Sequence, residues 1–161
     1  MFQLLQVTRT FGAALVALGL TASAANAAER YQIEGTFDGC EFGKYYALLG
    51  GGILECQEYN YFYEFMPEVI ASGLQVITIG KQRINGRLHK GSVIKTKVSD
   101  SFEGCEFDKT YRFDNGLIFK CMTYSYSYSY RPDVKIIVVE GTKPTVYINN
   151  QKYDGMLFRG R

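Results

Sequence analysis

Two rows of alternating aromatic residues are the part of this sequence best suited to bind a ligand. Both rows place a ring at every second position; the members are Tyr59, Tyr61, Tyr63 and Phe65 in the first row, and Tyr124, Tyr126, Tyr128 and Tyr130 in the second. Side chains two positions apart share one face of an extended chain. An exposed row of rings could stack on the sugars of an envelope glycan such as peptidoglycan, while the phenol hydroxyls form hydrogen bonds.

The same pattern is also typical of two structural roles. The rings could form the core, or the seam between two parts of the chain, with their hydroxyls at the rim. Alternatively, a row could pair with another molecule along an exposed strand edge. The sequence leaves all three interpretations open, and it therefore allows a homo-oligomer.

Four cysteines predict two disulfides, because an even number in an exported protein indicates paired thiols. The pairings Cys40–Cys56 and Cys105–Cys121 are favoured because both have the same spacing, so that each closes a segment on itself. In the chain-entropy model such a link stabilises the fold by about 3 kcal/mol. Zinc bound by four thiolates is the alternative, but Cys-x-x-Cys pairs are absent, so no metal site is expected.

Few residues could perform acid–base chemistry. Glu41 with Lys44, and Glu106 with Lys109, are repeated charged neighbours that would serve as a recognition pair or as solvated surface charges. His89 is the only histidine, and a polar residue at a strand end is the simpler interpretation of it. No catalytic set and no cofactor motif is identified. A small envelope enzyme or enzyme inhibitor that uses Glu41, Glu106 or His89 stays open as an alternative.

The aromatic and cysteine patterns occur twice because the chain contains an internal repeat. Between residues 36 and 69, fifteen of the 34 positions are identical to the residue 65 places further on. The tails align as well, residues 79–88 over 148–157, after four extra residues in the second copy. We expect two β-units, 28–91 and 92–161. Units this small bury little apolar surface alone, so they should pack together, depend on the disulfides, or both.

Local signals within each unit all indicate strands. Residues 74–79 and 134–139 are β-branched runs of strand length. Asn115-Gly116 is a strong hairpin signal, and a two-residue turn there would place Cys121 opposite Thr110. Five or so short strands per unit predict an all-β fold of two tandem small SH3-like barrels or strongly bent antiparallel sheets.

The start of the chain is typical of a secretory signal. Arg9 is followed by an apolar run over residues 11–20 and by small residues up to Ala25-Asn26-Ala27. We therefore expect residues 1–27 to be a signal peptide cleaved after about Ala27. The apolar run is half the length of a spanning helix, which needs about 20 residues, so no stable membrane insertion is expected. The protein should be periplasmic or secreted.

The charge balance argues against nucleic acid as a partner. The chain has 18 Lys and Arg against 16 Asp and Glu, and the leader removes Arg9. The remaining net charge near +1 includes no clustered basic segment of the kind that phosphate-backbone binding requires.

Each unit resembles a group of small exported proteins found largely in alphaproteobacteria. Their pattern is Phe-x-Gly, Leu-x-Asn-Gly-x-Ile-Trp or Phe, alternating Tyr, and Pro-x-Val-x-Ile. The second unit carries it at Phe102, Gly104, Phe113, Asn115, Gly116, Ile118, Phe119, Tyr124, Tyr126, Tyr128, Tyr130, Pro132, Val134 and Ile136. The resemblance covers nearly the whole mature chain as two copies and implies SH3-like small barrels without catalytic residues. This sequence differs in having no Trp and in its cysteine pairs.

Taken together, these features predict an exported, non-catalytic binding or structural protein of the cell envelope. The expected partner is an envelope glycan or an envelope protein. A self-assembling scaffold and a small envelope enzyme or enzyme inhibitor are the alternatives.

Overall fold

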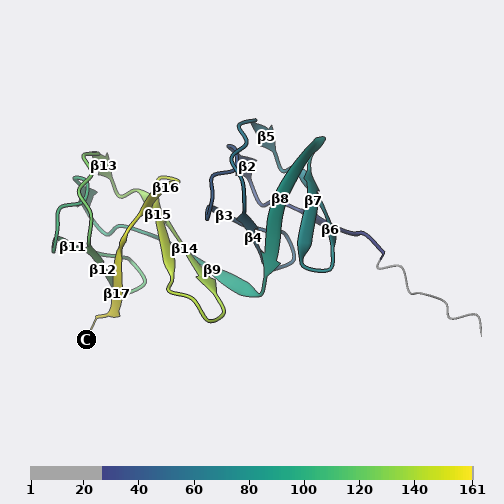
Figure 1. Cartoon of the computed structure of the whole chain (residues 1–161). Helices are drawn as coiled ribbons and strands as arrows, with labels where there is room; N and C mark the ends of the chain where they lie inside the picture. Colours follow the sequence, from purple (N-terminus) through teal and green to yellow (C-terminus); the bar gives the residue numbers. More distant parts are fainter. Residues whose placement is uncertain (1–26, 161) are drawn as a thin grey trace, which may run out of the picture.

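The computed structural model describes residues 27–160, and this part of the chain is all β, with no helix. It accordingly contains no helical segment that is long and apolar enough to cross a membrane. Apart from Ala27, the predicted leader lies outside the described residues. The strands form two groups that lie side by side (Figure 1).

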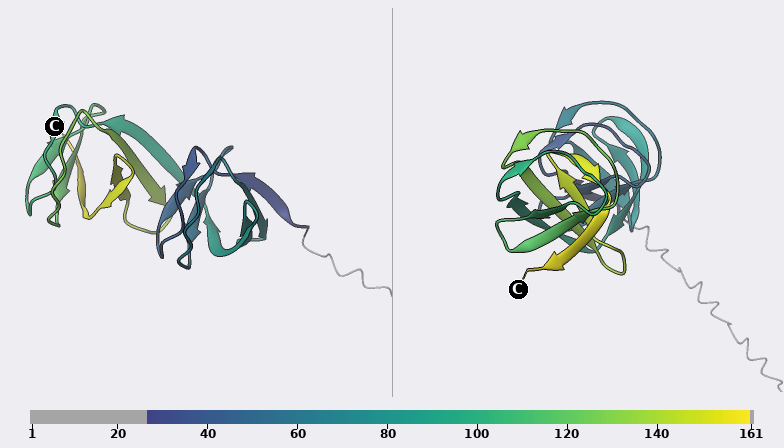
Figure 2. Two further views of the ribbon diagram at one scale, coloured as in Figure 1. Left: turned by 90° about the horizontal axis from the view of Figure 1, so that it is seen from above. Right: turned by 90° about the vertical axis from the view of Figure 1, so that its left-hand side faces the viewer.

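The first group is built on a six-stranded antiparallel sheet. Its strands, in spatial order, are β1 (Glu29–Gln32), β6 (Glu68–Ser72), β7 (Gln75–Ile79), β8 (Gln82–His89), β4 (Ile53–Cys56) and β3 (Tyr45–Ala47). A separate short pair is formed by β2 (Thr36–Phe37) and β5 (Glu64–Phe65). A register shift between Ile70 and Ala71 bends the sheet, and in the end-on view the strands curl around their own interior (Figure 2).

The second group contains three smaller sheets. One has the order β16 (Gln151–Tyr153), β15 (Thr145–Ile148), β14 (Asp133–Val139) and β9 (Gly91–Lys97). Another has the order β11 (Thr110–Arg112), β12 (Leu117–Cys121) and β17 (Gly155–Arg159), and the third pairs β10 (Ser101–Phe102) with β13 (Ser129–Tyr130). Below, β1–β8 are the first unit and β9–β17 the second unit.

Strand pairs in the two units have the same register. Tyr46 faces Leu54, and the residues 65 positions further on, Tyr111 and Phe119, also face each other. Both units contain more strands than the five expected, since the expected long strands are divided by bends and loops. The short second-row strand β13 is an example, because only Ser129 and Tyr130 of that row pair as a strand.

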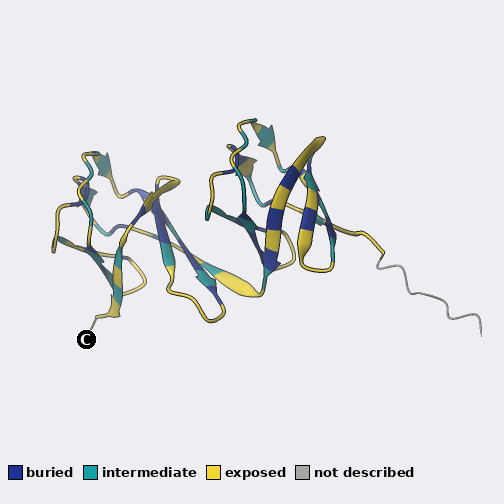
Figure 3. Cartoon of the chain, viewed as in Figure 1, coloured by how far each residue is buried: buried dark blue, intermediate teal, exposed yellow. Residues whose placement is uncertain are grey.

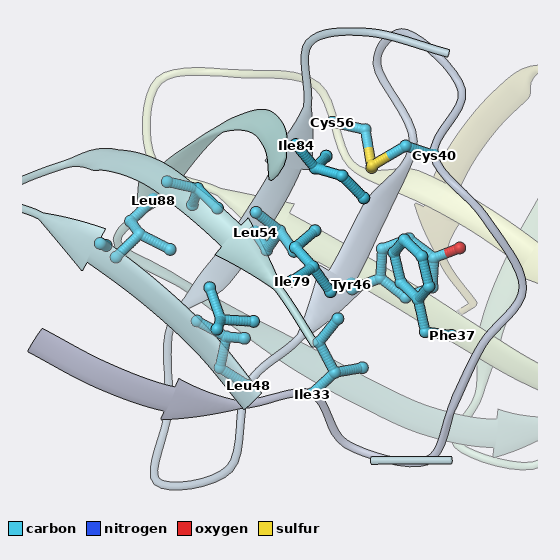
Figure 4. Packing of buried hydrophobic residues seen from close by; sticks show 13 residues of the cluster. Ile33, Phe37, Cys40, Tyr46, Leu48, Leu54, Cys56, Ile79, Ile84 and Leu88 are labelled. Carbon is cyan, nitrogen blue, oxygen red and sulfur yellow. A yellow bond between two sulfur atoms is a disulfide. The ribbon is translucent and has the colours of Figure 1, made fainter. Parts of the chain in front are cut away.

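Each unit encloses its own apolar core. In β8, the buried residues Ile84, Gly86 and Leu88 alternate with exposed ones, as expected of a strand with one face on a core (Figure 3). Phe37 lies against Tyr46 in the first core, with ring centroids 4.8 Å apart (Figure 4). Full burial of one large apolar side chain stabilises a fold by about 1.5–3 kcal/mol, so these clusters provide most of the driving force for folding.

Disulfides Cys40–Cys56 and Cys105–Cys121 lie in these two cores. Their Cα atoms are 5.4 and 5.5 Å apart, within the normal range for a disulfide. These are the pairings expected from the equal spacing. All four cysteines are used, so no thiolate is left for the zinc site considered as an alternative.

The hairpin register differs by one residue from the expectation. Phe113, not Asp114, faces Leu117: the Phe113 amide donates to the Leu117 carbonyl at 2.8 Å, and Gly116 adopts a φ of 81°. The turn therefore has three residues and ends in a left-handed glycine, a common hairpin geometry. As a result Cys121 faces Lys109, whose carbonyl accepts the Cys121 amide at 2.8 Å, and the predicted pairing with Thr110 is wrong.

The two units contact each other through a third, smaller apolar cluster. Its buried members are Ile53 from the first unit and Ile137, Val139 and Tyr147 from the second. The Tyr45 amide donates to the Tyr147 hydroxyl oxygen at 3.1 Å across the same boundary. Because β9 follows β8 after only Lys90, this cluster forms directly beside the connection.

Candidate ligand-binding site

Both tyrosine rows point into solvent. Their seven tyrosines and Phe65 are between 70 and 98% exposed, with Tyr126 the most open. The serines between the rings of the second row, such as Ser125 and Ser127, are only partly exposed. The period-two alternation is therefore present even where the segment is not a regular strand. The interpretation of the rings as buried in the core or in the seam is wrong, and the rings are available to a ligand.

The two rows end on the same side of the molecule. The first row ends in β5 and the second in β13, and both strands lie along the upper side of their units in Figure 1. The backbones of both rows therefore approach the same side of the molecule.

Each row is held against its unit at two points. Near its start, the Ser125 amide donates to the Cys105 carbonyl at 2.8 Å, and Asn60 and Cys40 exchange two backbone hydrogen bonds of 3.0 and 2.7 Å. At the far end, Ser129 pairs with Phe102 in the β10–β13 ladder. The intervening residues face inward while the tyrosines face outward, so the disulfides fix the backbone that presents the rings.

A glycine stands directly before Cys40 and before Cys105. It lets the backbone of the row pass close to this segment of the unit. A Cβ on Gly39 would lie 2.8 Å from the Asn60 carbonyl oxygen, and one on Gly104 would overlap the Ser125 carbonyl oxygen. Both glycines also have positive φ values, 98° and 83°, which L side chains rarely adopt. Only glycine therefore fits beneath either row.

A lysine, a buried tyrosine and a carboxylate lie under each row in the same arrangement. In the first unit, Lys44 pairs with Asp38 at 2.9 Å and lies over the Tyr46 ring, 5.4 Å from its centroid. The Tyr46 hydroxyl donates to Asp38 at 2.6 Å. Burial, and then the bond to Asp38, raise the pKa of Tyr46 far above its usual value, so this phenol stays neutral.

The second unit repeats this arrangement with a longer acid. Lys109 pairs with Glu103 at 3.3 Å and lies 5.6 Å from the centroid of Tyr111. Hydrogen bonding to Tyr111 raises the pKa of Lys109 above its usual value. The partner of each lysine is thus the residue before the Gly-Cys pair, whereas Glu41 and Glu106 contribute backbone carbonyls to the Lys44 and Lys109 amides.

An open hollow of about 570 Å³ lies beside the second row. It is lined by Glu103, Cys105, Glu106, Lys109, Tyr124, Ser125, Tyr126, Ser127 and Tyr128. Rings, hydroxyls, carboxylates and an ammonium group therefore surround one space. This combination can stack on a flat apolar face and hydrogen-bond to a hydroxylated edge.

The structure does not bring together the three residues considered for acid–base chemistry. Glu106 lies in the hollow beside the second row, and Glu41 is an exposed residue of the first unit. His89 instead contacts Glu55, with 2.7 Å between Nε2 and Oε2, and lines a different hollow near β1. An acid–base site built jointly from Glu41, Glu106 and His89 is therefore not present. Within residues 27–160, no group of three His, Cys, Asp or Glu side chains is placed to hold a metal ion.

The sequence reasoning missed a second polar hollow, which lies where the two units meet. Lys135, Tyr147 and Asn150 line it from the second unit, and Asp38 and Tyr63 from the first. The available signal was a departure from the repeat: Lys135 stands where the first unit has Ile70. Only the packing of the units shows that this lysine faces the other unit.

Comparison with protein-family models, curated proteins and solved structures gave no match. The function is therefore inferred from the geometry of the chain itself.

Proposed function

We propose that this chain is an exported, non-catalytic binding protein of the cell envelope, and that its two tyrosine rows bind an envelope glycan. The observation that carries the proposal is the exposure of all seven row tyrosines, each at least 70% open to solvent. Single exposed apolar residues are ordinary, but large exposed apolar patches are uncommon and mark interaction sites. Here the backbone of each row is fastened by a disulfide, so the rings are displayed in a fixed array.

The chemistry of the array favours a sugar polymer over an apolar partner. Each ring offers a flat face and a hydroxyl, and Glu106 and the Glu103–Lys109 pair supply further hydrogen-bonding groups beside the second row. A carbohydrate presents the complementary combination of a C–H face and a hydroxylated rim. Placement of both rows on one side suits a polymer that contacts the two units in turn (Figure 1).

The proposal includes export and a small-barrel architecture. Cleavage of a signal peptide after about Ala27 would deliver the chain to the periplasm or the outside, where the two disulfides are stable. We propose that each unit is an SH3-like barrel, as the resemblance to small exported alphaproteobacterial proteins implies; the curled sheet of the first unit and its own closed core support this.

Sedimentation of the mature chain with purified, insoluble peptidoglycan tests the proposal. We expect the wild-type protein to sediment with the polymer and the Tyr126→Ala/Tyr128→Ala variant to bind about 5- to 150-fold more weakly, because each lost ring removes about 0.5–1.5 kcal/mol. Leu74→Ala is the matched control, since Leu74 is a large exposed apolar residue outside both rows. It should bind like the wild type.

One outcome would contradict glycan binding. Wild-type protein that stays in the supernatant removes the glycan as ligand. Sedimentation velocity at high protein concentration then examines the self-assembling scaffold: oligomers that the Tyr126→Ala/Tyr128→Ala substitution disperses would show that the rows bind a second copy of the chain.

A further inference from the structure

The hollow between the two units contains a cation without a counter-ion. The hollow is lined by Thr36, Asp38, Lys44, Tyr45, Tyr46, Tyr63, Lys135, Tyr147 and Asn150; we call it the seam hollow. Lys135 and Asn150 also line a neighbouring hollow, so that the two spaces meet at these residues. The seam hollow therefore exists only when both units are in place.

Lys135 is half-buried at the centre of this region. It lies on β14, where it faces Lys95 on one neighbouring strand and Tyr147 on the other. Among residues 27–160, no carboxylate lies within ion-pair distance of Lys135. Burial, together with the charge of Lys95, lowers the pKa of Lys135 below its usual value.

The two carboxylates whose charges act on Lys135 are already engaged by other lysines. Glu34 pairs with Lys95, and Asp38 pairs with Lys44 at 2.9 Å. An anion from outside would therefore find Lys135 free to form a charge-assisted hydrogen bond, which is stronger than a neutral one. Such a ligand would also offset the repulsion between Lys135 and Lys95.

The walls of the seam hollow indicate what the rest of this ligand would be. Tyr63, the last tyrosine of the first row, lines the hollow together with Lys135 while 75% exposed, so that the row reaches this hollow. The Tyr147 hydroxyl oxygen accepts a hydrogen bond from the Tyr45 amide. The hydroxyl proton of Tyr147 therefore stays available for donation to a ligand. Asn150 adds a side-chain amide from the two-residue turn between β15 and β16, where both asparagines have positive φ.

We infer that the seam hollow binds the carboxylate of an acidic sugar, with Lys135 as its ion-pair partner and Tyr63 against its ring. This inference rests on the proposed function and makes it more specific: the preferred glycan carries carboxylates. The site arises once in the chain, because Lys135 replaces the Ile70 of the first unit and Tyr147 contacts the first unit through Tyr45.

Titrations with two related sugars test the inference. N-acetylmuramic acid carries a carboxylate, and N-acetylglucosamine is its neutral counterpart. Followed by NMR on the mature chain, the acid should bind at least about tenfold more tightly, as one charge-assisted hydrogen bond predicts. Lys135→Gln should remove this preference and leave binding of the neutral sugar unchanged. Lys152→Gln is the control, because Lys152 is an exposed lysine on the same sheet outside the hollow.

The outcomes separate this inference from the proposed function. Equal binding of the two sugars by the wild type, or a preference that survives Lys135→Gln, would overturn the acidic-sugar site even if peptidoglycan still sediments with the protein. Conversely, the wild type could prefer the acidic sugar through Lys135 and yet fail to bind the polymer. This result would support the acidic-sugar site and contradict the proposal that the tyrosine rows bind the glycan. Acetate that binds as well as N-acetylmuramic acid would reduce the site to a general anion site and also contradict the inference.

Discussion

At the scale of single residues, Gly104 marks a place where two backbone segments pass close together. Gly104 and Gly116 have nearly the same φ, 83° and 81°, yet only Gly104 has a neighbour that a Cβ would meet. The cost of a positive φ and the cost of a blocked crossing can therefore be measured separately at these two positions.

We predict that Gly116→Ala lowers the free energy of unfolding by about 1–2 kcal/mol, which is the cost of placing an L residue in the left-handed region. Gly104→Ala should cost about 1–3 kcal/mol more, because the methyl group would overlap the Ser125 carbonyl and force the second row away. Urea denaturation of both variants measures the difference. Equal losses would mean that the row shifts freely and is not fastened at Gly104.

The residue types in the sequence were sufficient to identify the disulfide partners and the exposed rings, but not to identify which charged side chains pair with each other. Equal spacing favoured Cys40–Cys56 and Cys105–Cys121, the pairs that the structure contains. By contrast, proximity in sequence suggested Glu41 as the partner of Lys44, whereas the chain turns between Glu41 and Lys44, at Gly43 with its positive φ, and that lysine pairs with Asp38 instead. A turn that depends on one positive φ is poorly predicted from spacing.

At the scale of elements, each row depends on the disulfide beneath it. The Ser125 amide bonds to Cys105, and the Asn60 amide bonds to Cys40, so that each disulfide holds its own row. Strand-forming tendency contributes little here, since only the final two residues of each row are in a strand.

We predict that the Cys105→Ala/Cys121→Ala variant exchanges the Ser125 amide hydrogen roughly 100-fold faster, because the loss of a 15-residue closed loop costs about 3 kcal/mol. The Asn60 amide should change far less. The Cys40→Ala/Cys56→Ala variant should show the reverse, and it is the matched control. Hydrogen exchange followed by NMR gives both rates; equal acceleration of both amides in either variant would show that the rows are not held separately.

Element types were predictable from the sequence, but their lengths and the hairpin register were not. The β-branched runs became β7 and β14, almost at the expected bounds. The Asn115-Gly116 signal correctly marked a hairpin, but Asp114 joined the turn and moved the register by one residue. Two- and three-residue turns share the same residue preferences, so local sequence alone does not decide between them.

At the scale of the whole molecule, the two units meet at the small apolar cluster, at the seam hollow and through the Glu34–Lys95 ion pair. Ile53 and Leu54 are neighbours on β4, yet Ile53 packs in the cluster between the units and Leu54 packs in the first core. Opposite faces of one strand thus serve two different cores. The sequence suggested that the units pack together, but nothing in its periodicity showed which strand faces join them.

We predict that Ile53→Ala separates thermal unfolding of the protein into two transitions, one for each unit, because it removes apolar contact mainly from the boundary. Leu54→Ala should cost about 2–5 kcal/mol and leave a single, lower transition, since the boundary is intact. Differential scanning calorimetry distinguishes these results. One transition in Ile53→Ala, shifted as in Leu54→Ala, would contradict a boundary that couples the units.

Because both rows lie on one side of a molecule joined at a packed boundary, ligand length should control avidity. A fragment that covers a single row gains only the affinity of that row. A longer polymer that has bound one row meets the other at an effective concentration in the millimolar range, set by the fixed distance between the units. Binding should therefore increase sharply once an oligomer is long enough to bridge that distance, and then change little with further length.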